Sequence, residues 1–221
     1  MTSHNLFKCS NESVKTQFEY LEGLLHQLQN KDDYTYCHCF RVSKLVAKFG
    51  KFLNLDEKQV GGLELAGFFH DIGKVYIPEE VLNKTGELTD SDRKILKEHP
   101  QFGYELMNKV NLLECILPGV LYHHERSDGK GYPVGLRGEE IPFDARLISI
   151  VDAFDAMISN RVYAKAHSFE KALIILIDEK GKQFDSQLVS QFCDMMDLEI
   201  ANNRKPIVSE HLMFFQTCLD N

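Results

Sequence analysis

The sequence of 221 residues has no apolar run of the roughly 20 residues that a membrane-spanning helix requires. Its first residues, MTSHNLFKCS, lack the charged start and long apolar stretch of a secretory signal. The six cysteines are scattered, without a repeated C-x-x-C spacing, so free thiols in a reducing compartment are the simplest interpretation. These absences predict a cytoplasmic protein that does not enter a membrane.

An excess of positive charge is also missing. The formal net charge is -8, from 25 basic and 33 acidic residues. Proteins that bind nucleic-acid polymers generally present a basic surface, so the composition argues against that class. It leaves room for a small anionic ligand, because a few local basic residues can outweigh the net charge.

Alternating polar and apolar residues, the pattern of a β-strand, are scarce, and helical spacing dominates. The chain is long enough for one large domain, and the pattern predicts an all-α fold. Glycine and proline gather in 77–90 and 127–142, which we interpret as loops, and Thr89 or Asp90 can cap the helix after the first loop. The expected helices are 13–30, 34–53, 57–72, 90–110, 112–124, 142–159, 168–180 and 185–197.

Histidine and aspartate occur within apolar helical segments that lie far apart in the sequence. Five of the nine histidines and two aspartates stand in such phrases, namely His38, His70, Asp71, His99, His123, His124 and Asp152. Taken singly, each can be a packed core histidine or a capping aspartate. Together they suit first-row divalent ions, and they are too many for one ion. Two ions that share a bridging carboxylate fit better, and Asp71 is the natural bridge.

Several phrases in register carry a family resemblance. "HDIGK" (70–74), "HHERSDGKGYPVGL" (123–136) and "VDAFDAM" (151–157) resemble the HD-GYP family of cyclic-di-GMP phosphodiesterases, a branch of the HD superfamily of metal-dependent phosphohydrolases. The resemblance runs from about Asp33 to Phe192. It implies a helical HD-domain bundle with additional C-terminal helices over 33–197. Residues 1–32 would be a helical extension, and 198–221 a tail packed on the domain.

The resemblance also assigns roles. One ion would bind His38, His70, Asp71 and Asp152, and the other Asp71, His99, His123 and His124. Lys74 would approach the scissile phosphate and act beside Asp71 in catalysis. Arg161 matches a substrate-binding arginine, and Arg137 and Arg146 are candidates for substrate contact or structural ion pairs. Tyr132 belongs to the Gly-Tyr-Pro loop, which in the family lies beside the active site.

Two positions depart from the family pattern. Tyr34 stands four residues before His38, where some members have a glutamate that supports a third metal, so we expect two ions. Iron and manganese are the first candidates, and zinc also suits the ligands. Ala164 follows Tyr163 where many members have a basic residue, and Lys165 would point about 100° away on a helix. One substrate contact is therefore in doubt.

The implied reaction is hydrolysis of cyclic-di-GMP to pGpG or GMP through a hydroxide bridging the two ions. The alternatives are another cyclic dinucleotide such as 3′,3′-cyclic GMP-AMP, a general HD nucleotide phosphohydrolase, and a non-catalytic scaffold that binds cyclic-di-GMP. The Gly-Tyr-Pro loop has been linked to diguanylate cyclase partners in the family. An oligomer contact through the N-terminal helix or the tail is also open.

The phrase "DYTYCHCFRV" (33–42) sets three metal-binding residue types in a row. On a helix, His38 falls on the apolar stripe, while Cys37 falls on a solvated basic face with Arg41 and three lysines. Cys39 falls at the other edge of the core. Because neighbours on a helix diverge, we expect one ligand, His38, and two bystanders.

Overall fold

The computed structural model describes residues 11–160 and 166–203, and this part of the chain contains helices and no β-strand. The all-α prediction is confirmed. The α-helices are α1 (Asn11–Lys31), α2 (Asp33–Phe52), α3 (Glu57–Phe69), α4 (Glu79–Leu82), α5 (Asp90–Leu96), α6 (His99–Met107), α7 (Leu117–Tyr122), α8 (Phe143–Ile158), α9 (Phe169–Asp178) and α10 (Ser186–Asn203). Three 3₁₀ helices join them: η1 (Ile72–Tyr76), η2 (Asn111–Ile116) and η3 (Gly138–Glu140).

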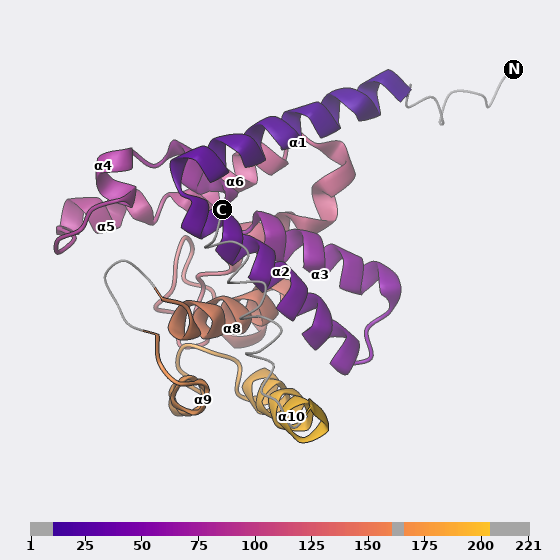
Figure 1. The fold of residues 1–221 in the computed structure, drawn as a ribbon, viewed down its shortest axis with the longest axis vertical. Helices are drawn as coiled ribbons and strands as arrows, with labels where there is room; N and C mark the ends of the chain where they lie inside the picture. Colours follow the sequence, from indigo (N-terminus) through magenta and orange to yellow (C-terminus); the bar gives the residue numbers. More distant parts are fainter. Residues whose placement is uncertain (1–10, 161–165, 204–221) are drawn as a thin grey trace, which may run out of the picture.

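The bundle is built around α2, which packs against both α3 and α8. Its apolar stripe, with Val42 and Phe49 fully buried, meets residues of α8 and α10 such as Phe154 and Phe192. Helix α7 packs against α3, α6 and α8 on another side. Figure 1 shows α9 and α10 at the end of the molecule remote from α1. The centre of the bundle therefore lies where α2, α3, α7 and α8 meet.

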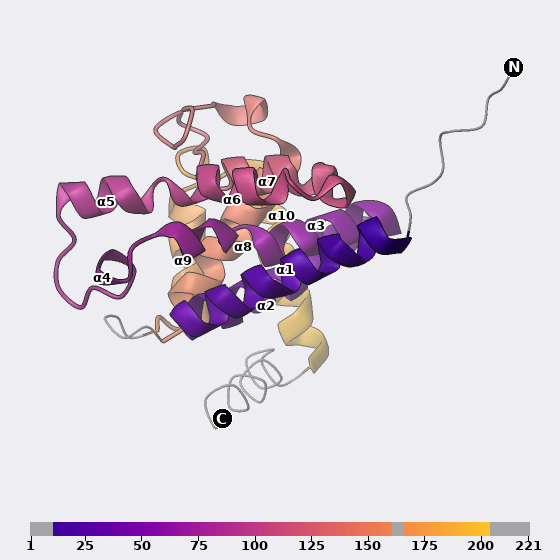
Figure 2. The ribbon, with the colours of Figure 1, turned by 90° about the horizontal axis from the view of Figure 1, so that it is seen from above.

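Helix α1 runs alongside α2 and also contacts η1 (Figure 2). Two of its leucines, Leu24 and Leu28, belong to the core. The Lys31 amine donates a hydrogen bond to the Val75 carbonyl at 2.7 Å, so α1 fastens the short turn that follows the HD pair. None of the helices in the described residues is both long and apolar enough to cross a membrane.

Two expected helices are each divided, and the predicted loop 77–90 contains the short helix α4. The segment 112–124 forms η2 and α7, with Pro118 at the start of α7. The segment 90–110 forms two helices, α5 and α6, which break at Lys97 and Glu98. Pro100 has no amide hydrogen and restricts the residue before it, so it starts a helix more readily than it continues one. Thr89 is the N-cap of α5, and its side chain accepts a hydrogen bond from the amide of Asp92. The predicted tail 198–221 begins instead as part of α10, which runs to Asn203. Residues 204–221 of that tail, Arg161, and the pair Ala164 and Lys165 lie outside the described residues.

Candidate metal centre and its pocket

The HD pair sits at the end of α3, in the middle of the bundle. His70 is 0% exposed and Asp71 is 3% exposed. The following η1 turn lies so close to α6 that a β-carbon on Gly73 would meet the His99 carbonyl oxygen at 2.0 Å. Only glycine allows this approach, and the approach brings the start of α6, with His99, to the HD pair.

All seven predicted metal ligands come together here, in two groups. Asp71, His99, His123 and His124 each offer one ligand atom within 4.8 Å of the others, and His38, His70 and Asp152 do the same. Asp71 faces both groups. Its Oδ1 lies 3.1 Å from His99 Nε2, and its Oδ2 lies 3.4 Å from His70 Nε2. This is the placement expected of a carboxylate that joins two ions.

Backbone carbonyls set the orientation of three of the histidines. Nδ1 of His70, His99 and His123 donates to the carbonyl of the residue three positions earlier, at 2.7 to 2.8 Å. A carbonyl only accepts, so the proton sits on Nδ1 and Nε2 is turned toward the centre. Hydrogen bonds of this kind commonly fix the rings of metal-binding histidines.

The electrostatics of the group that contains His123 and His124 favour neutral imidazoles. Burial, followed by the charge of neighbouring histidines, holds the pKa of His123 well below its usual value. Burial and then His99 lower the pKa of His124 to about 3. The Nε2 atoms of His99 and His123 lie only 3.3 Å apart. With the Nδ1 protons committed to carbonyls, two lone pairs point at one another, which a cation between them would relieve.

Two buried atoms of the HD pair have no hydrogen-bond partner among the described residues: His70 Nε2 and Asp71 Oδ1. The approach of Asp71 Oδ1 to His99 lacks hydrogen-bond geometry. A buried polar atom without a partner costs about 1–3 kcal/mol, so native proteins rarely leave one unexplained. Nitrogen and carboxylate donors aimed into one space fit divalent first-row ions. The residues present therefore suit a metal centre.

His38 lies between two carboxylates. Its Nδ1 is 2.7 Å from Asp155 Oδ2, and its Nε2 is 2.9 Å from Asp152 Oδ1. Burial lowers the pKa of His38, but the hydrogen bonds to Asp152 and Asp155 outweigh it and raise the pKa. The ring of Tyr34 lies parallel to the imidazole, 6.3 Å away between centroids.

Arg41 corrects the sequence analysis, which placed it on a solvated face. It is 7% exposed, and its guanidinium donates two hydrogen bonds to Asp155, at 2.9 and 2.8 Å. Asp155, near the C-terminal end of α8, compensates the buried positive charge of Arg41. Cys37 is half-buried and joins no metal-binding group among the described residues. Cys39, expected to be a bystander, is 1% exposed and lies with His70 and Asp71, with one ligand atom of each within 4.8 Å of the others.

Lys74 stands at the edge of the centre. Its amine donates to Asp71 Oδ2 at 2.6 Å, and its side chain is 22% exposed. Burial lowers the pKa of Lys74, but the nearby Asp71 charge outweighs it and raises the pKa, so the amine stays protonated. A protonated amine at this position can reach an anionic ligand that enters from solvent.

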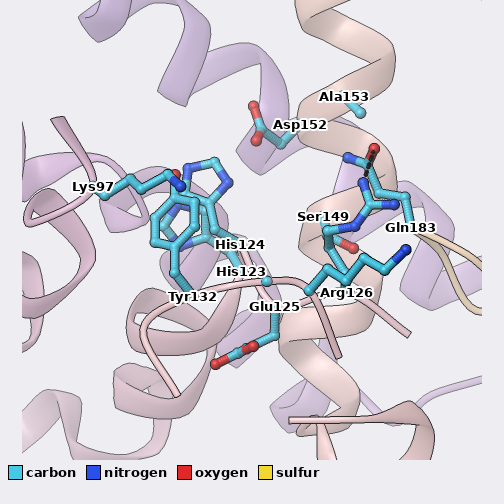
Figure 3. Close-up of a pocket in the computed structure, with 12 residues that line it drawn as sticks. Lys97, His123, His124, Glu125, Arg126, Tyr132, Ser149, Asp152, Ala153 and Gln183 are labelled. Carbon is cyan, nitrogen blue, oxygen red and sulfur yellow. Dashed lines mark hydrogen bonds between the residues drawn. The ribbon is translucent and has the colours of Figure 1, made fainter. Parts of the chain in front are cut away.

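A pocket of about 320 Å³ opens onto the metal-binding groups (Figure 3). His123, His124 and Asp152 form part of its wall, and three basic residues, Lys97, Arg126 and Lys130, line it as well. Figure 3 shows Lys97 and Tyr132 on one side and Arg126 with Gln183 on the other. The pocket therefore combines the predicted ligand histidines with the amines of Lys97 and Lys130, which suits a phosphorylated ligand. The Arg126 guanidinium is already paired with Asp128.

Aromatic and cationic groups meet at the rim of the pocket. The ring of Tyr132 stacks on His124 at 4.8 Å between centroids, and the Lys97 amine lies 5.2 Å from the centre of the Tyr132 ring. A cation over an aromatic face is favourable. This arrangement places the tyrosine of the Gly-Tyr-Pro loop directly over a histidine that is predicted to bind metal.

The loop after α7 is organised by Glu125, which is 3% exposed. Its carboxylate accepts hydrogen bonds from the backbone amides of Val134, Gly135 and Leu136 at 2.7 to 3.1 Å. Gly131 lies against the backbone of the same loop, where a β-carbon would be 2.5 Å from the Glu125 Cα. The glutamate and the glycine together fold the loop back over the pocket.

Only some of the residues predicted to bind substrate lie at the pocket or the metal centre. Tyr132 lines the pocket and Lys74 adjoins the centre, whereas Arg146 pairs with Asp185 at 2.7 Å and Arg137 lies exposed over Gly129. Neither arginine lines the pocket.

Four residues of the site were not predicted: Lys97, Glu125, Arg126 and Asp155. Glu125 and Arg126 directly follow the histidine pair, but no pattern in the sequence distinguishes the buried Glu125 from Arg126, which lines the pocket.

An HD-domain family matches residues 19–188. The chain belongs to this family. Among curated relatives, the cyclic di-GMP phosphodiesterase response regulator RpfG of Xanthomonas campestris is 37% identical over 83% of this chain and 49% of its own length. The 3′3′-cGAMP-specific phosphodiesterase 2 of Vibrio cholerae is 31% identical over 85% of this chain and 36% of its own length. The chain thus spans half or less of the length of these relatives.

Solved structures agree on the fold. The HD domain of the phosphodiesterase PgpH from Listeria monocytogenes, in complex with cyclic-di-AMP, aligns with a TM-score of 0.59 at 19% identity, over 84% of this chain and 99% of that one. An HDG"Y"P protein from Bdellovibrio bacteriovorus aligns with a TM-score of 0.61 at 21% identity, over 75% of this chain and 53% of that one. The predicted HD-domain helical bundle is confirmed.

Proposed function

We propose that this protein is a metal-dependent phosphodiesterase that hydrolyses a cyclic dinucleotide, with cyclic-di-GMP as the first candidate. The observation that carries the proposal is the position of Asp71, whose two carboxylate oxygens face the two groups of histidines. The names of the curated relatives support the substrate class.

Seven residues would hold two divalent ions: His38, His70 and Asp152 on one side, His99, His123 and His124 on the other, and Asp71 between them. Iron and manganese are the first candidates, and zinc is compatible. A pair of ions in such a site can activate a water and neutralise the phosphate charge. We expect no third ion, because Tyr34 offers a ring where a carboxylate would be needed.

The chain's own residues would bind and orient the substrate. Lys74, already beside Asp71, would donate a hydrogen bond to a phosphate oxygen and stabilise the charge that develops on it. Tyr132 offers an aromatic ring at the rim for a base, and Lys97 and Lys130 add positive charge around the pocket. Hydrolysis of the 3′–5′ phosphodiester would yield pGpG, and a second cleavage would yield GMP.

Two alternative functions are compatible with this site. The relative named as 3′3′-cGAMP-specific supports cyclic GMP-AMP as an alternative substrate. A non-catalytic cyclic-di-GMP scaffold is the alternative from another class. A diguanylate cyclase partner would dock on the Gly-Tyr-Pro loop, where Val134 is 64% exposed.

The test is turnover by protein loaded anaerobically with Fe(II) or Mn(II). Cyclic-di-GMP, cyclic GMP-AMP and cyclic-di-AMP are supplied separately, and products are identified by chromatography. Wild type should release pGpG or GMP, Asp71→Asn should not, and Asp90→Asn, an exposed aspartate at the start of α5, should match wild type. Full metal occupancy without cleavage of any cyclic dinucleotide would contradict the proposed enzyme and favour the scaffold.

A further inference from the structure

Cys39 follows His38 on α2, yet its side chain joins a different set of groups. It is 1% exposed, and its sulfur lies with one ligand atom each of His70 and Asp71, all within 4.8 Å of one another. The other cysteines in the described part of the chain, Cys37, Cys115 and Cys193, belong to no such group. The thiol therefore stands beside the HD pair, in the interior of the bundle.

A second observation points to a ligand at this place. His70 Nδ1 is occupied by the Gly67 carbonyl, which leaves Nε2 as the nitrogen available to the group. That Nε2 and Asp71 Oδ1 are the two buried atoms of the HD pair that lack a hydrogen-bond partner. Cys39 thus lies beside two residues that each carry a buried ligand atom without a hydrogen-bond partner in the described part of the chain.

The dimensions suit a thiophilic ion. Zinc binds sulfur at about 2.3 Å and nitrogen at about 2.0–2.1 Å, so a tetrahedral ion holds a sulfur and a nitrogen about 3.6 Å apart. Ligand atoms that lie within 4.8 Å of one another would have to close by at most about 1.2 Å, which changes of side-chain rotamer can supply. Soft thiolate ligands favour zinc over manganese, which prefers oxygen.

We propose that Cys39, with His70 and Asp71, forms an alternative metal site that recruits a thiophilic divalent ion such as zinc or cobalt. The sulfur–metal bond forms as the thiol proton passes to solvent. The site shares His70 with the His38, His70 and Asp152 group, so an ion held by Cys39 excludes the ion expected there. Cys39 would then decide which metal the centre accepts. The inference rests on the metal centre of the proposed function.

Cobalt(II) reports on the ligands directly. Metal-free full-length protein is titrated anaerobically with Co(II) and followed by absorption. Wild type is expected to show a near-ultraviolet thiolate-to-cobalt charge-transfer band along with the weaker visible bands of bound cobalt. In Cys39→Ser the charge-transfer band should vanish while the visible bands remain, and Cys37→Ser, on the same helix, should behave as wild type.

A second measurement needs no variant. X-ray absorption at the zinc edge of wild type should reveal a sulfur neighbour at about 2.3 Å. Loss of an outer-shell partner already costs about 10–100-fold in metal affinity, so Cys39→Ser should lower zinc affinity at least about tenfold and leave manganese affinity unchanged.

The outcomes separate the two hypotheses. Bound cobalt or zinc without a sulfur signal in wild type overturns the role of Cys39 and leaves the metal centre intact. No binding of any divalent ion by wild type overturns the metal centre and, with it, this inference.

Discussion

The Nδ1 atom of His38 lies 2.7 Å from Asp155, a carboxylate one helical turn after Asp152 on α8. The same carboxylate accepts two hydrogen bonds from the buried Arg41. Asp155 therefore orients a predicted ligand and compensates a buried charge. We expect Asp155→Asn to weaken metal binding about 10–100-fold, because outer-shell partners hold the ligand ring in place. Metal titration of the purified variant measures the effect.

Asp155→Ala should be more damaging. Breaking a buried ion pair by removing one partner typically costs about 3–5 kcal/mol, and here Arg41 would remain buried without its carboxylate. Urea denaturation of metal-free protein measures the loss. Asp144→Asn, on the same helix and outside the centre, is the control and should change little. Wild-type stability and metal affinity in both Asp155 variants would contradict this role.

The loop after α7 gives a second prediction. Glu125→Gln places an amide that can donate where three backbone amides need an acceptor. An unmet buried group costs about 1–3 kcal/mol, so the loop should open more often. Trypsin should then cleave faster after the exposed Lys130 and Arg137. Glu139→Gln, an exposed glutamate of the same loop, should leave the cleavage rate unchanged, and equal rates in all three proteins would refute the role of Glu125.

The sequence allowed the metal ligands to be predicted because each lies in a phrase that the family resemblance aligns. Helical periodicity placed His38 on the buried face correctly. The same periodicity predicted that Arg41 is exposed to solvent, which is wrong. Helical spacing shows which face of α2 Arg41 occupies, but it cannot show that Asp155, 114 positions later in the sequence, pairs with Arg41 there. Such long-range pairs are set by how helices pack.

The pocket was harder to predict than the centre. Lys97 lines it from the break between α5 and α6, and Arg126 from the loop after α7; neither residue is distinctive in sequence. The break between α5 and α6, by contrast, was readable, since Pro100 stands beside His99. Proline favours the first turn of a helix over its interior, so Pro100 indicates a helix start near His99 even within a continuous helical pattern.

Acid should destabilise the metal-free protein through His124. Its folded pKa of about 3, set by burial and then by His99, lies below its unfolded value near 6.5. As the pH falls between these values, the unfolded chain binds the proton first, and the free energy of unfolding falls by up to about 1.4 kcal/mol per pH unit. His38 and His70 have raised pKa values and oppose this trend.

The effect of His124 on the pH dependence of stability is therefore measured as the difference between wild type and a variant without this histidine. Denaturation of wild type and His124→Gln is compared at several pH values between about 6.5 and 4, with chelator present. Glutamine does not titrate, so wild type should lose stability faster than the variant as the pH falls. Parallel pH profiles would rule out a His124 that stays neutral in the folded protein.

The glycines of α3 and η1 give a matched test of the contact that assembles the centre. A β-carbon at Gly73 would lie 2.0 Å from the His99 carbonyl oxygen and 2.5 Å from the Gly103 amide, both of them backbone atoms. Gly73→Ala must therefore push η1 away from α6 and separate Asp71 from His99. We expect a loss of about 4 kcal/mol or more in urea denaturation, in the range of the most damaging substitutions.

Gly61→Ala is the control, because it lies in α3 with no atom within 4 Å of the added β-carbon. Alanine there should stabilise the helix by about 0.5–1 kcal/mol, since glycine loses more backbone freedom on folding. Any Gly73→Ala protein that still folds should bind metal less tightly than Gly61→Ala, because the groups on either side of Asp71 would no longer meet. If Gly73→Ala kept both the stability and the metal affinity of wild type, the close contact between η1 and α6 would not be what brings His99 to the HD pair.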